Sequence, residues 1–381
     1  MTLLMPPLSI ETPRVLFDLS RLVRQKRRPF PTGVDRIDLA IARQLVARFG
    51  ESCLFVHASA AGPALIPHAI GARLLDRLDR RWRGEAGPAA VLSPRALAIG
   101  RLRAARGAFR ELATPETTYV NACHSGLPRR LGALERIDPE RRMRRLAYIH
   151  DIIPLEHPEY QTVRSVERFA AFLDALAAAP IRFHTNSADT ARRLSAHAAA
   201  QGWTVEGVEP AIPRLAAPVR PTGPGGSLRP EVRALLESST PYCVVLGTIE
   251  PRKNHLLLLH IWREFAAEPA PPTLVIVGRR GWENEMVVDI LDRCAAIAPI
   301  VREFGDLADA EAQALLAGAR ALLLPSFAEG LGLPLLEAGA AGTPCIVSDL
   351  PAFREVAPAG ARFLSPIDGP GWKQAIRNVT S

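Results

Sequence analysis

Long hydrophobic runs are missing from this sequence of 381 residues. No segment approaches the roughly 20 consecutive apolar residues that span a bilayer, so we do not expect an integral membrane protein. The first residues, MTLLMPPLSIETPRVLFDLS, also lack the basic start, the continuous apolar core and the small-residue cleavage site of a secretory signal peptide. We therefore expect a cytoplasmic protein.

Cysteine is scarce as well, and metal-ligand patterns are absent. The five cysteines are scattered and odd in number, without a Cys-x-x-Cys pair, which argues against a disulfide framework and against a zinc site. The sequence also contains no Asp-x-Asp pair. We expect neither a metal ion nor any other cofactor.

Lysine is rare, and charge is unevenly distributed. Only three of the 47 basic residues are lysine, so arginine reflects a compositional bias and a single lysine is the more informative residue. Residues 1–220 carry a net charge of +12 and residues 221–381 a net charge of −4. The basic first half leaves open a non-catalytic protein that binds nucleic acid or an anionic membrane.

Short apolar runs rich in β-branched residues alternate with longer helical patterns along the whole chain. This alternation is typical of parallel sheets built from β-α-β units, so both halves are predicted to be doubly wound α/β domains. We expect strands at 14–18, 53–57, 118–122, 145–149 and 181–185 in the first half, and at 242–247, 273–278, 300–305, 321–326 and 344–348 in the second.

A stretch rich in proline and glycine, PVRPTGPGGSLRP at 218–230, separates the two halves. The predicted organisation is an N-terminal Rossmann-like domain over 1–220, a linker over 221–230 and a C-terminal Rossmann-like domain over 231–381. Two such domains joined by a hinge leave a cleft between them. Ligands of open α/β sheets bind beyond the carboxyl ends of the strands, so this cleft is the expected site.

The segment AEGLGLPLLEAG places Glu329 and Glu337 on the two sides of a glycine turn, after a predicted strand. We expect a helix from Pro334 to Ala341 that ends at Gly342. The free N–H groups at such a helix start favour a phosphate, whereas carboxylates accept hydrogen bonds from hydroxyl groups. This pattern suggests a nucleotide sugar, with hydroxyls on both sides of a diphosphate. The alternative is that both glutamates are ordinary surface and helix-start residues.

A second motif, GTIEPRKNHLLLLHIWREF at 247–265, places Arg252 and Lys253 just after another predicted strand. A guanidinium fork and a point charge together suit a diphosphate leaving group. We expect an amphipathic helix after them, with the apolar face formed by Leu256, Leu257, Leu259, His260, Trp262 and Phe265.

These two motifs resemble the donor half of the retaining glycosyltransferases of family four, which have the two-domain GT-B fold. The resemblance covers most of residues 240–360 and includes a Glu-x7-Glu motif. It implies that Arg252 and Lys253 bind the donor diphosphate, that Glu329 contacts the donor sugar and that Glu337 binds the ribose. It also implies that the backbone lies near the sugar and phosphates at Gly330, Leu331, Gly332 and Leu333.

The first half resembles this family more loosely. PTGVDRIDLAIARQLVARFG at 31–50 has a glycine before an amphipathic helix, and the resemblance places Gly33 near the donor diphosphate, although the usual double glycine is absent. His150, in IHD at the end of a predicted strand, resembles a histidine near the donor sugar; a structural His-Asp corner is the alternative. Ser187 follows another strand and suits a helix cap as well as an acceptor contact.

The predicted function is a retaining glycosyltransferase that uses a nucleotide-sugar donor, with GDP-mannose favoured over a UDP-sugar by analogy. The acceptor is a glycan or a lipid-linked glycan of a bacterial surface polysaccharide, held by the N-terminal domain. The basic run at 21–30 suits such an anionic acceptor and leaves open peripheral contact with the inner face of the plasma membrane. A nucleotide-sugar epimerase of the same fold and the basic binding protein remain the rival hypotheses, and nucleic acid is not the expected partner.

Overall fold

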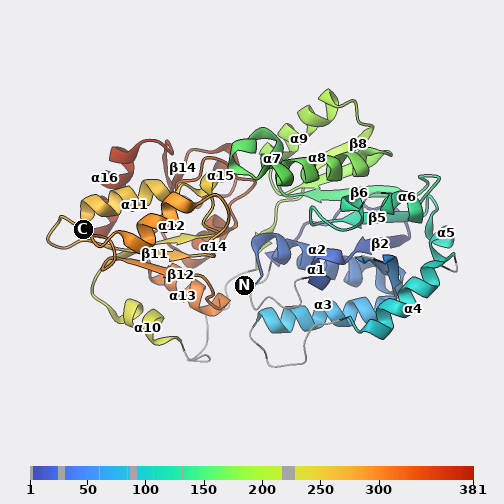
Figure 1. The fold of residues 1–381 in the computed structure, drawn as a ribbon, viewed down its shortest axis with the longest axis horizontal. Coiled ribbons are helices and arrows are strands. Elements are labelled where there is room, and N and C mark those ends of the chain that lie inside the picture. The colour runs from blue at the N-terminus through green and yellow to red at the C-terminus, as the bar shows by residue number, and fades with distance from the viewer. Residues whose placement is uncertain are drawn as a thin grey trace. The chain divides into compact units, whose positions relative to one another are not determined.

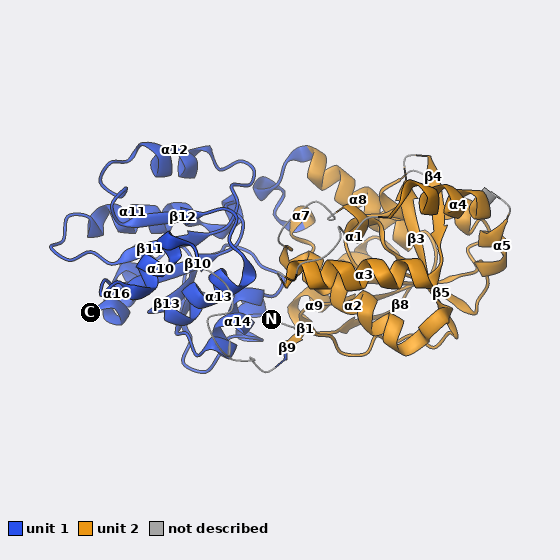
Figure 2. Ribbon diagram, turned by 90° about the horizontal axis from the view of Figure 1, so that it is seen from below, with its two compact units in different colours: residues 1–2, 156–163, 215–381 blue, residues 3–155, 164–214 orange. Residues whose placement is uncertain are grey.

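The protein consists of two compact units in a computed structural model that describes residues 3–24, 31–59, 61–83, 85, 92–105, 107–130, 132–216 and 228–381. The first unit, called the N-terminal unit, comprises residues 3–155 and 164–214, and the second, the C-terminal unit, comprises 156–163 and 215–381 (Figure 2). The short segment 156–163 therefore belongs to the C-terminal unit, although the chain reaches it from the middle of the N-terminal one. Residues 221–227 of the predicted linker lie outside the described residues.

The N-terminal unit is built on a seven-stranded sheet with the order β4-β3-β2-β5-β6-β7-β8. All neighbouring strands are parallel except β3 and β4. The five strands expected in this half are present within one or two residues, whereas the edge strands β4 and β8 were not predicted. The strand bounds are β2 Arg14–Asp18, β3 Cys53–Ser59, β4 Gly62–Ile66, β5 Thr117–Asn121, β6 Arg144–Ile149, β7 Ile181–Thr185 and β8 Val205–Pro210.

Helices cover both faces of this sheet, with α2 and α3 on one side and α8 and α9 on the other (Figure 1). Phe169, Phe172 and Leu173 of α8 pack into one core cluster with the sheet residues Leu16, Tyr119 and Phe183. Ser187 caps α9, because its hydroxyl accepts a hydrogen bond from the Thr190 N–H at 3.0 Å. The helix bounds are α1 Ser20–Arg24, α2 Gly33–Phe49, α3 His68–Trp82, α4 Pro94–Ala105, α5 Ala108–Leu112, α6 Ala133–Ile137, α7 Ile153–Glu156, α8 Val163–Ala177 and α9 Ala188–Ala200.

The C-terminal unit holds a six-stranded parallel sheet with the order β12-β11-β10-β13-β14-β15. Alternate residues of β10 enter different cores: Cys243 and Val245 pack in one cluster with α11 and α16, and Val244 packs in another with α13 and α14. This period of two is the mark of a strand buried on both faces. The strands are β10 Tyr242–Leu246, β11 Thr273–Val277, β12 Val301–Phe304, β13 Ala321–Leu324, β14 Cys345–Ser348 and β15 Arg362–Leu364.

The helices of the C-terminal unit are α10 Pro230–Glu237, α11 His255–Phe265, α12 Glu285–Arg293, α13 Asp309–Gly318, α14 Leu333–Ala341, α15 Pro351–Arg354 and α16 Gly369–Thr380. The expected helix from Pro334 to Ala341 with a stop at Gly342 is confirmed, because Gly342 caps α14 with a φ of 74°. The expected apolar face of α11 needs correction at His260, which is exposed, whereas Leu258 and Ile261 are buried. The buried residues Leu258, Ile261, Trp262 and Phe265 follow a spacing of three and four, and His260 lies off this stripe.

Strands β10 and β13 are hydrogen-bonded neighbours, with Cys243 opposite Ala321 and Val244 opposite Leu322. Because the two strands are parallel, the turns that follow them emerge at the same edge of the sheet. The Arg-Lys turn and the glycine turn, 76 positions apart in the chain at Lys253 and Glu329, are thereby brought together.

Candidate active site

The turn after β10 is fixed to the end of β13. It forms a short 3-10 helix over Pro251–Lys253, and Asn254 then takes the left-handed conformation with a φ of 56°. The Asn254 side chain donates hydrogen bonds to the carbonyl of Pro325 at 3.1 Å and to that of Pro366 at 2.8 Å. Asparagine tolerates this backbone region better than most residues, so it both shapes the turn and anchors it. The turn therefore presents Arg252 and Lys253 from a rigid base.

Glu329 is the centre of the charged cluster at this edge. Its carboxylate accepts hydrogen bonds from the Lys253 ammonium at 2.5 Å and from the Ser326 hydroxyl at 2.8 Å, and it lies 2.7 Å from Nη1 of Arg252. The side chain of Glu329 is only 7% exposed. Burial alone would raise the pKa of Glu329, but the charges of Arg252 and Lys253 outweigh it and lower the pKa to about 2. Glu329 is therefore ionised at every physiological pH.

Arg252 lies between two carboxylates. Its Nη2 is 2.6 Å from Glu250 while its Nη1 also donates to the carbonyl of Ala328 at 3.0 Å. The backbone reinforces this arrangement, since the Phe327 N–H donates to the carbonyl of Arg252 at 2.8 Å. The cluster thus contains two cations and two carboxylates, all largely buried and close to charge balance. Such a set can exchange one of its carboxylate contacts for an anionic ligand without leaving a cation bare.

The glycine turn leads directly from Glu329 into α14. Gly332 caps the helix with a φ of 94°, and a Cβ at this position would lie 2.7 Å from the Phe353 ring. Leu331 is buried, and Leu333 is the first helical residue. The N–H groups of a helix start carry partial positive charge and favour an anionic oxygen.

Glu337 lies one turn into α14 and is half-buried. The structure therefore brings Arg252, Lys253, Glu329 and the start of α14 to one edge of the sheet of the C-terminal unit, with Gly330 and Leu331 connecting them.

Tyr160 also belongs to this part of the molecule, although it was not among the predicted site residues. Its ring stacks on Phe327, two residues before Glu329, with ring centres 5.7 Å apart and planes 13° from parallel. The Trp282 indole N–H donates to the carbonyl of Tyr160 at 3.0 Å. Tyr160 ends the short 3-10 helix Pro158–Tyr160 in the segment that joins the C-terminal unit. This segment braces the glycine turn from outside.

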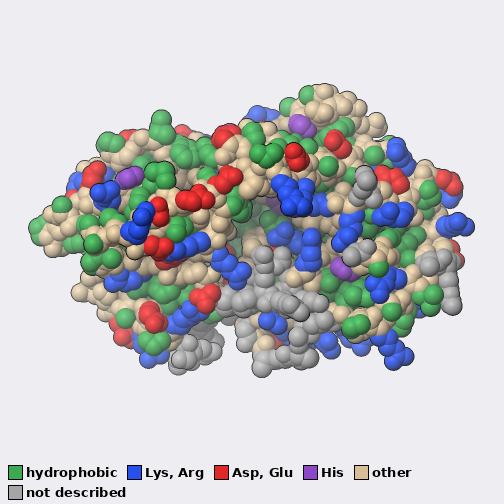
Figure 3. Space-filling model, in the orientation of Figure 1, with side chains coloured by type: hydrophobic (Ala, Val, Ile, Leu, Met, Phe, Trp, Pro, Cys, Tyr) green, Lys and Arg blue, Asp and Glu red, His purple; other side chains and the backbone are tan. Residues whose placement is uncertain are grey.

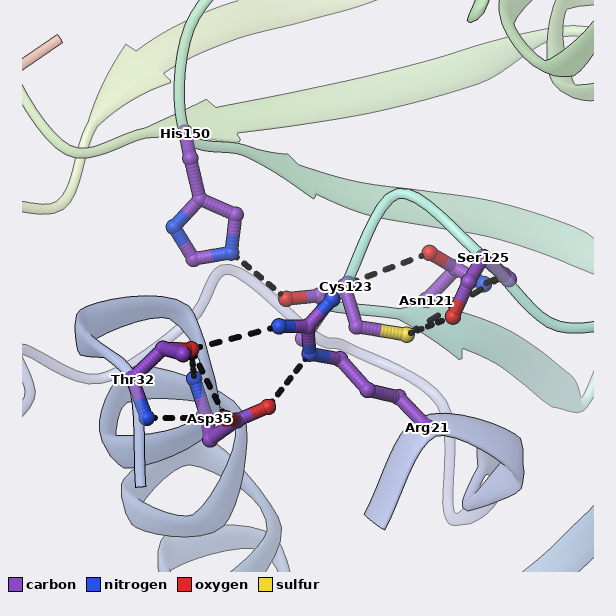
Figure 4. Close-up of polar contacts among 8 residues, drawn as sticks. Arg21, Thr32, Asp35, Asn121, Cys123, Ser125 and His150 are labelled. Atoms are coloured by element: carbon purple, nitrogen blue, oxygen red, sulfur yellow. Dashed lines mark hydrogen bonds and ion pairs between the residues drawn. The ribbon is translucent and has the colours of Figure 1, made fainter. Parts of the chain in front are cut away.

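The N-terminal unit places His150 directly after β6, as expected (Figure 4), and the residue is buried. The ring Nε2 donates to the carbonyl of Ala122 at 2.8 Å, so a backbone group holds the imidazole. Asp151 instead accepts from the Ile153 N–H at 3.2 Å. A backbone carbonyl, rather than the Asp151 carboxylate, therefore holds the imidazole.

His124 is a second histidine at this edge, and it was not among the predicted residues. Its Nε2 accepts a hydrogen bond from the His150 N–H at 2.9 Å, and the two rings lie edge to face 5.0 Å apart. Burial and neighbouring positive charge lower the pKa of both histidines to about 3, so both are neutral. His124 has a φ of 48°, unusual for a residue other than glycine, and such strain is common at functional sites.

Gly33 is the first residue of α2, and the start of this helix is already occupied by a capping box. The Thr32 N–H donates to the Asp35 carboxylate at 2.8 Å, and the Asp35 N–H donates to the Thr32 hydroxyl at 3.3 Å. Arg21 completes the arrangement with its Nε 2.6 Å from Asp35 (Figure 4). A carboxylate therefore sits at the helix start where the sequence suggested an anionic ligand. Residues 25–30 of the basic run lie outside the described residues.

Two carboxyl groups lie deeper in the N-terminal unit. Asp18 accepts hydrogen bonds from the Tyr119 hydroxyl and from the Leu127 N–H, both at 2.7 Å. Asp38 is completely buried, and neither of its carboxylate oxygens has a hydrogen-bond partner among the described residues. Burial, together with the charges of Asp35 and Asp18, raises the pKa of Asp38 well above its usual range despite the opposing charge of Arg21. Asp38 therefore favours its neutral form.

In the residues that the structure describes, no group of three or more His, Cys, Asp or Glu side chains is arranged to hold a metal ion. None of the described helices combines the length and the apolar character needed to cross a membrane.

Comparison with known proteins finds a family match within the C-terminal unit. Residues 240–381 match the model of a protein family described as glycosyl transferases group 1, so this part of the chain carries a group 1 glycosyltransferase domain. Over 223 residues the chain is 30% identical to the serotype-specific mannosyltransferase WbdA of Escherichia coli. The aligned stretch is 57% of this chain and 27% of WbdA. It is 34% identical over 128 residues to the O-antigen chain mannosyltransferase B of Escherichia coli, 33% of each chain. The chain spans about a quarter to a third of the length of these relatives.

The fold is GT-B. The crystal structure of Anabaena HepE in complex with UDP-glucose matches with a TM-score of 0.61 over 96% of this chain and 89% of HepE, at 15% sequence identity. WaaG, a glycosyltransferase involved in lipopolysaccharide biosynthesis, matches with a TM-score of 0.55 over 96% of this chain and 90% of WaaG, at 13% identity. Likeness at this level of identity concerns the fold alone.

Proposed function

We propose that this protein is a retaining glycosyltransferase of family four that transfers mannose from GDP-mannose to a glycan or lipid-linked glycan in bacterial surface polysaccharide synthesis. The observation that carries the proposal is the cluster of Glu329 with Lys253 and Arg252 at the ends of two neighbouring strands. A binding protein for nucleic acid has no use for a buried carboxylate that neutralises its cations. A site that holds a diphosphate beside sugar hydroxyls needs both kinds of group.

The leaving group is the first part of the mechanism. Arg252 and Lys253 are the cations that stabilise the diphosphate as negative charge grows on it, because both are positioned in a largely buried site before the reaction begins. The free N–H groups at the start of α14 also stabilise the negative charge of the diphosphate. When the diphosphate takes up the two cations, the Glu329 oxygens become available to sugar hydroxyls, which is the role the resemblance gives to this residue.

The donor base and the ribose form the second part. Glu337 is proposed to accept hydrogen bonds from the ribose diol, since a carboxylate one turn inside the helix lies beyond the phosphate position. GDP-mannose is favoured because WbdA, the O-antigen chain mannosyltransferase B and a further relative, RfbU, are named as mannosyltransferases. The HepE structures hold UDP or UDP-glucose, so a UDP-sugar is the competing donor.

Retention of configuration follows from the resemblance to family four. The acceptor hydroxyl attacks the face from which the diphosphate departs, and the departing phosphate takes the acceptor proton. Neither step requires a metal ion or a covalent nucleophile. His150 is proposed to contact the donor sugar as a neutral hydrogen-bonding group, because its pKa near 3 excludes a cationic role at neutral pH. A cytoplasmic location, where nucleotide sugars and acceptor meet, belongs to the same proposal.

The test is a transfer assay with GDP-[14C]mannose and UDP-[14C]glucose, each with and without a mannose-terminated oligosaccharide acceptor. The proposal expects label in the oligosaccharide from the GDP-sugar, no added metal requirement, and an α-linked product by NMR from the α-linked donor. Lys253→Gln should abolish transfer, and Lys373→Gln is the matched control because Lys373 pairs with Glu264 on α11, away from the turn. Acceptor-independent conversion of the sugar would favour the epimerase, and no nucleotide binding with salt-dependent nucleic-acid binding would favour the basic binding protein.

A further inference from the structure

Three arginines of the N-terminal unit lie at the carboxyl edge of its sheet. Arg24 ends α1, the helix that follows β2, and Arg129 ends the short 3-10 helix Leu127–Arg129 that follows β5. Strands β2 and β5 are parallel neighbours, with Phe17 opposite Val120, so the segments after them emerge side by side. Arg24 and Arg129 are both exposed.

Arg168 joins them from helix α8. The next residue, Phe169, packs against the His124 ring with ring centres 5.1 Å apart, and His124 lies in the loop that leads from β5 to Arg129. This contact places the first half of α8 over that loop, with Arg168 exposed. Figure 3 shows Lys and Arg side chains gathered on this face, over the elements that Figure 1 labels α1 and α8.

The charges of Arg24 and Arg168 both act on Arg129. Partial desolvation lowers the pKa of Arg129, and the charges of Arg24 and Arg168 lower it further, with a smaller contribution from Arg21. Like charges held together cost free energy in the unliganded protein, and an anion placed among them recovers that cost.

Some exposed arginines of the molecule are neutralised by carboxylates, and in the part of the chain that the structure describes these three are not. Arg43 lies 2.6 Å from Asp79, and Arg280 and Arg354 each pair with carboxylates at 2.7 Å or less. Within the described ranges, neither Arg24 nor Arg129 nor Arg168 has a carboxylate within ion-pair distance. Among the described residues, the guanidinium groups at this edge therefore remain available to an anionic ligand.

We propose that Arg24, Arg129 and Arg168 bind a phosphate group of the acceptor substrate. Guanidinium forks match phosphate oxygens in pairs, so three forks carried by three neighbouring elements suit the several oxygens of a diphosphate or a phosphate monoester better than the two oxygens of a carboxylate. The inference rests on the proposed glycosyltransferase function and names its acceptor as a phosphate-bearing glycan, either a lipid-linked diphosphate or a soluble sugar phosphate. Arg21 is left out of the binding set because Asp35 already holds it.

The first experiment measures anion binding without catalysis. Inorganic pyrophosphate is titrated calorimetrically into the full-length Arg252→Gln/Lys253→Gln protein, in which the proposed donor site has lost its cations. We expect pyrophosphate to bind, and the further pair Arg129→Gln/Arg168→Gln to weaken it at least about tenfold. The control is Arg103→Gln, an exposed arginine of α4 in the same unit, which should leave the affinity unchanged.

The second experiment separates the sources of the phosphate and the two proposals. In otherwise wild-type protein, Arg129→Gln/Arg168→Gln should leave GDP affinity intact and raise KM at least about tenfold for phosphate-bearing acceptors, but not for a neutral oligosaccharide. An effect on a soluble mannose 1-phosphate as well as on a lipid-linked diphosphate identifies the phosphate itself as the group recognised, and an effect on the lipid-linked acceptor alone identifies the diphosphate lipid.

Two results would overturn the inference. Unchanged pyrophosphate affinity in the Arg129→Gln/Arg168→Gln protein would show that the arginines are solvated surface groups. Loss of sedimentation with phosphatidylglycerol vesicles, without loss of pyrophosphate binding, would show that they contact a membrane surface instead. If the otherwise wild-type protein does not bind GDP, the donor site is not as proposed, and this result would count against the proposed function and not against the phosphate site.

Discussion

Replacing Glu329 by glutamine should separate nucleotide binding from sugar transfer. The change keeps the size of the side chain and removes its charge from a site where it faces Lys253 at 2.5 Å and Arg252 at 2.7 Å. The glutamine amide has only one oxygen, so its NH2 group must face either Lys253 or Arg252. The cluster also loses one negative charge and becomes more positive by one unit. Two consequences follow, one for stability and one for ligand affinity.

The cost in stability can be worked from the pKa of Glu329. A carboxyl group whose pKa falls from 4.5 to about 2 on folding contributes about 3 kcal/mol at neutral pH. Because the folded pKa is the lower one, this contribution is complete above pH 4.5 and is lost as the pH falls toward 2. For a unit of this size, 3 kcal/mol corresponds to roughly 10 °C in Tm. The difference in Tm between the wild type and Glu329→Gln should therefore shrink steadily between pH 5 and pH 3.

The effect on ligands should go the other way. With Glu329 neutral, Lys253 and Arg252 attract a diphosphate without competition, so GDP should bind as tightly as to the wild type or up to about tenfold more tightly. Mannose transfer should fall by a factor of 100 or more, because the carboxylate that accepts the sugar hydroxyls is gone. Calorimetry with GDP and the transfer assay give the two numbers. If Glu329→Gln lost GDP binding as fully as Lys253→Gln while remaining folded, Glu329 would be a nucleotide ligand and the reasoning would be refuted.

Three further changes test other parts of the structure. Tyr160→Ala should raise the donor KM several-fold by removing the ring stacked on Phe327, whereas Tyr160→Phe should not; equal KM values for the two variants would deny the segment a positioning role. Gly332→Ala should cost at least 1–2 kcal/mol in denaturant unfolding, given its φ of 94° and the Phe353 ring 2.7 Å from the new Cβ, and an unchanged midpoint would contradict this. Asp38→Asn should raise Tm by a margin that grows with pH above about 4, because a raised folded pKa costs stability as the pH rises through it; a margin that shrank with pH would show that Asp38 is ionised and paired.

The parts of the fold that the sequence predicted well are the buried strands. Val244 and Cys243 face different cores, so the whole run around them must be apolar, and an apolar run of β-branched residues is recognisable without a structure. The edge strands β4, β8 and β15 are not buried on both faces along their whole length, so their sequences need not be continuously apolar. β4 begins with Gly-Pro, and most of β8 is only half-buried. Their place in the sheet depends on the neighbouring strand rather than on their own composition.

The site divides in the same way. Arg252, Lys253 and Glu329 follow strands directly, and parallel strands bring such residues to one edge, so their meeting was predictable. The partners of these residues were not. The hydrogen bond from Asn254 to the carbonyl of Pro325 and the stacking of Tyr160 on Phe327 both join residues that are distant in the sequence. Both contacts depend on tertiary structure, so no sequence pattern indicates them.

His150 illustrates the limit in the N-terminal unit. Its position at the end of β6 was predictable, whereas its neutral state depends on burial and on the neighbouring charges, and its contact with His124 depends on a strained loop between β5 and α6. Gly33 shows the same limit, since Thr32 and Asp35 form a capping box at the start of α2 and Arg21 of a separate helix pairs with Asp35.

Calorimetric titration of GDP and of inorganic pyrophosphate into the wild type, Lys253→Gln and Glu337→Ala tests the central claim most directly. If a nucleotide diphosphate lies along the glycine turn with its ribose at Glu337, then Lys253→Gln should weaken both ligands, whereas Glu337→Ala should weaken GDP about tenfold or more and leave pyrophosphate unchanged. Equal affinity of the Glu337→Ala protein and the wild type for GDP, or absence of GDP and UDP binding to the wild type, would contradict the account.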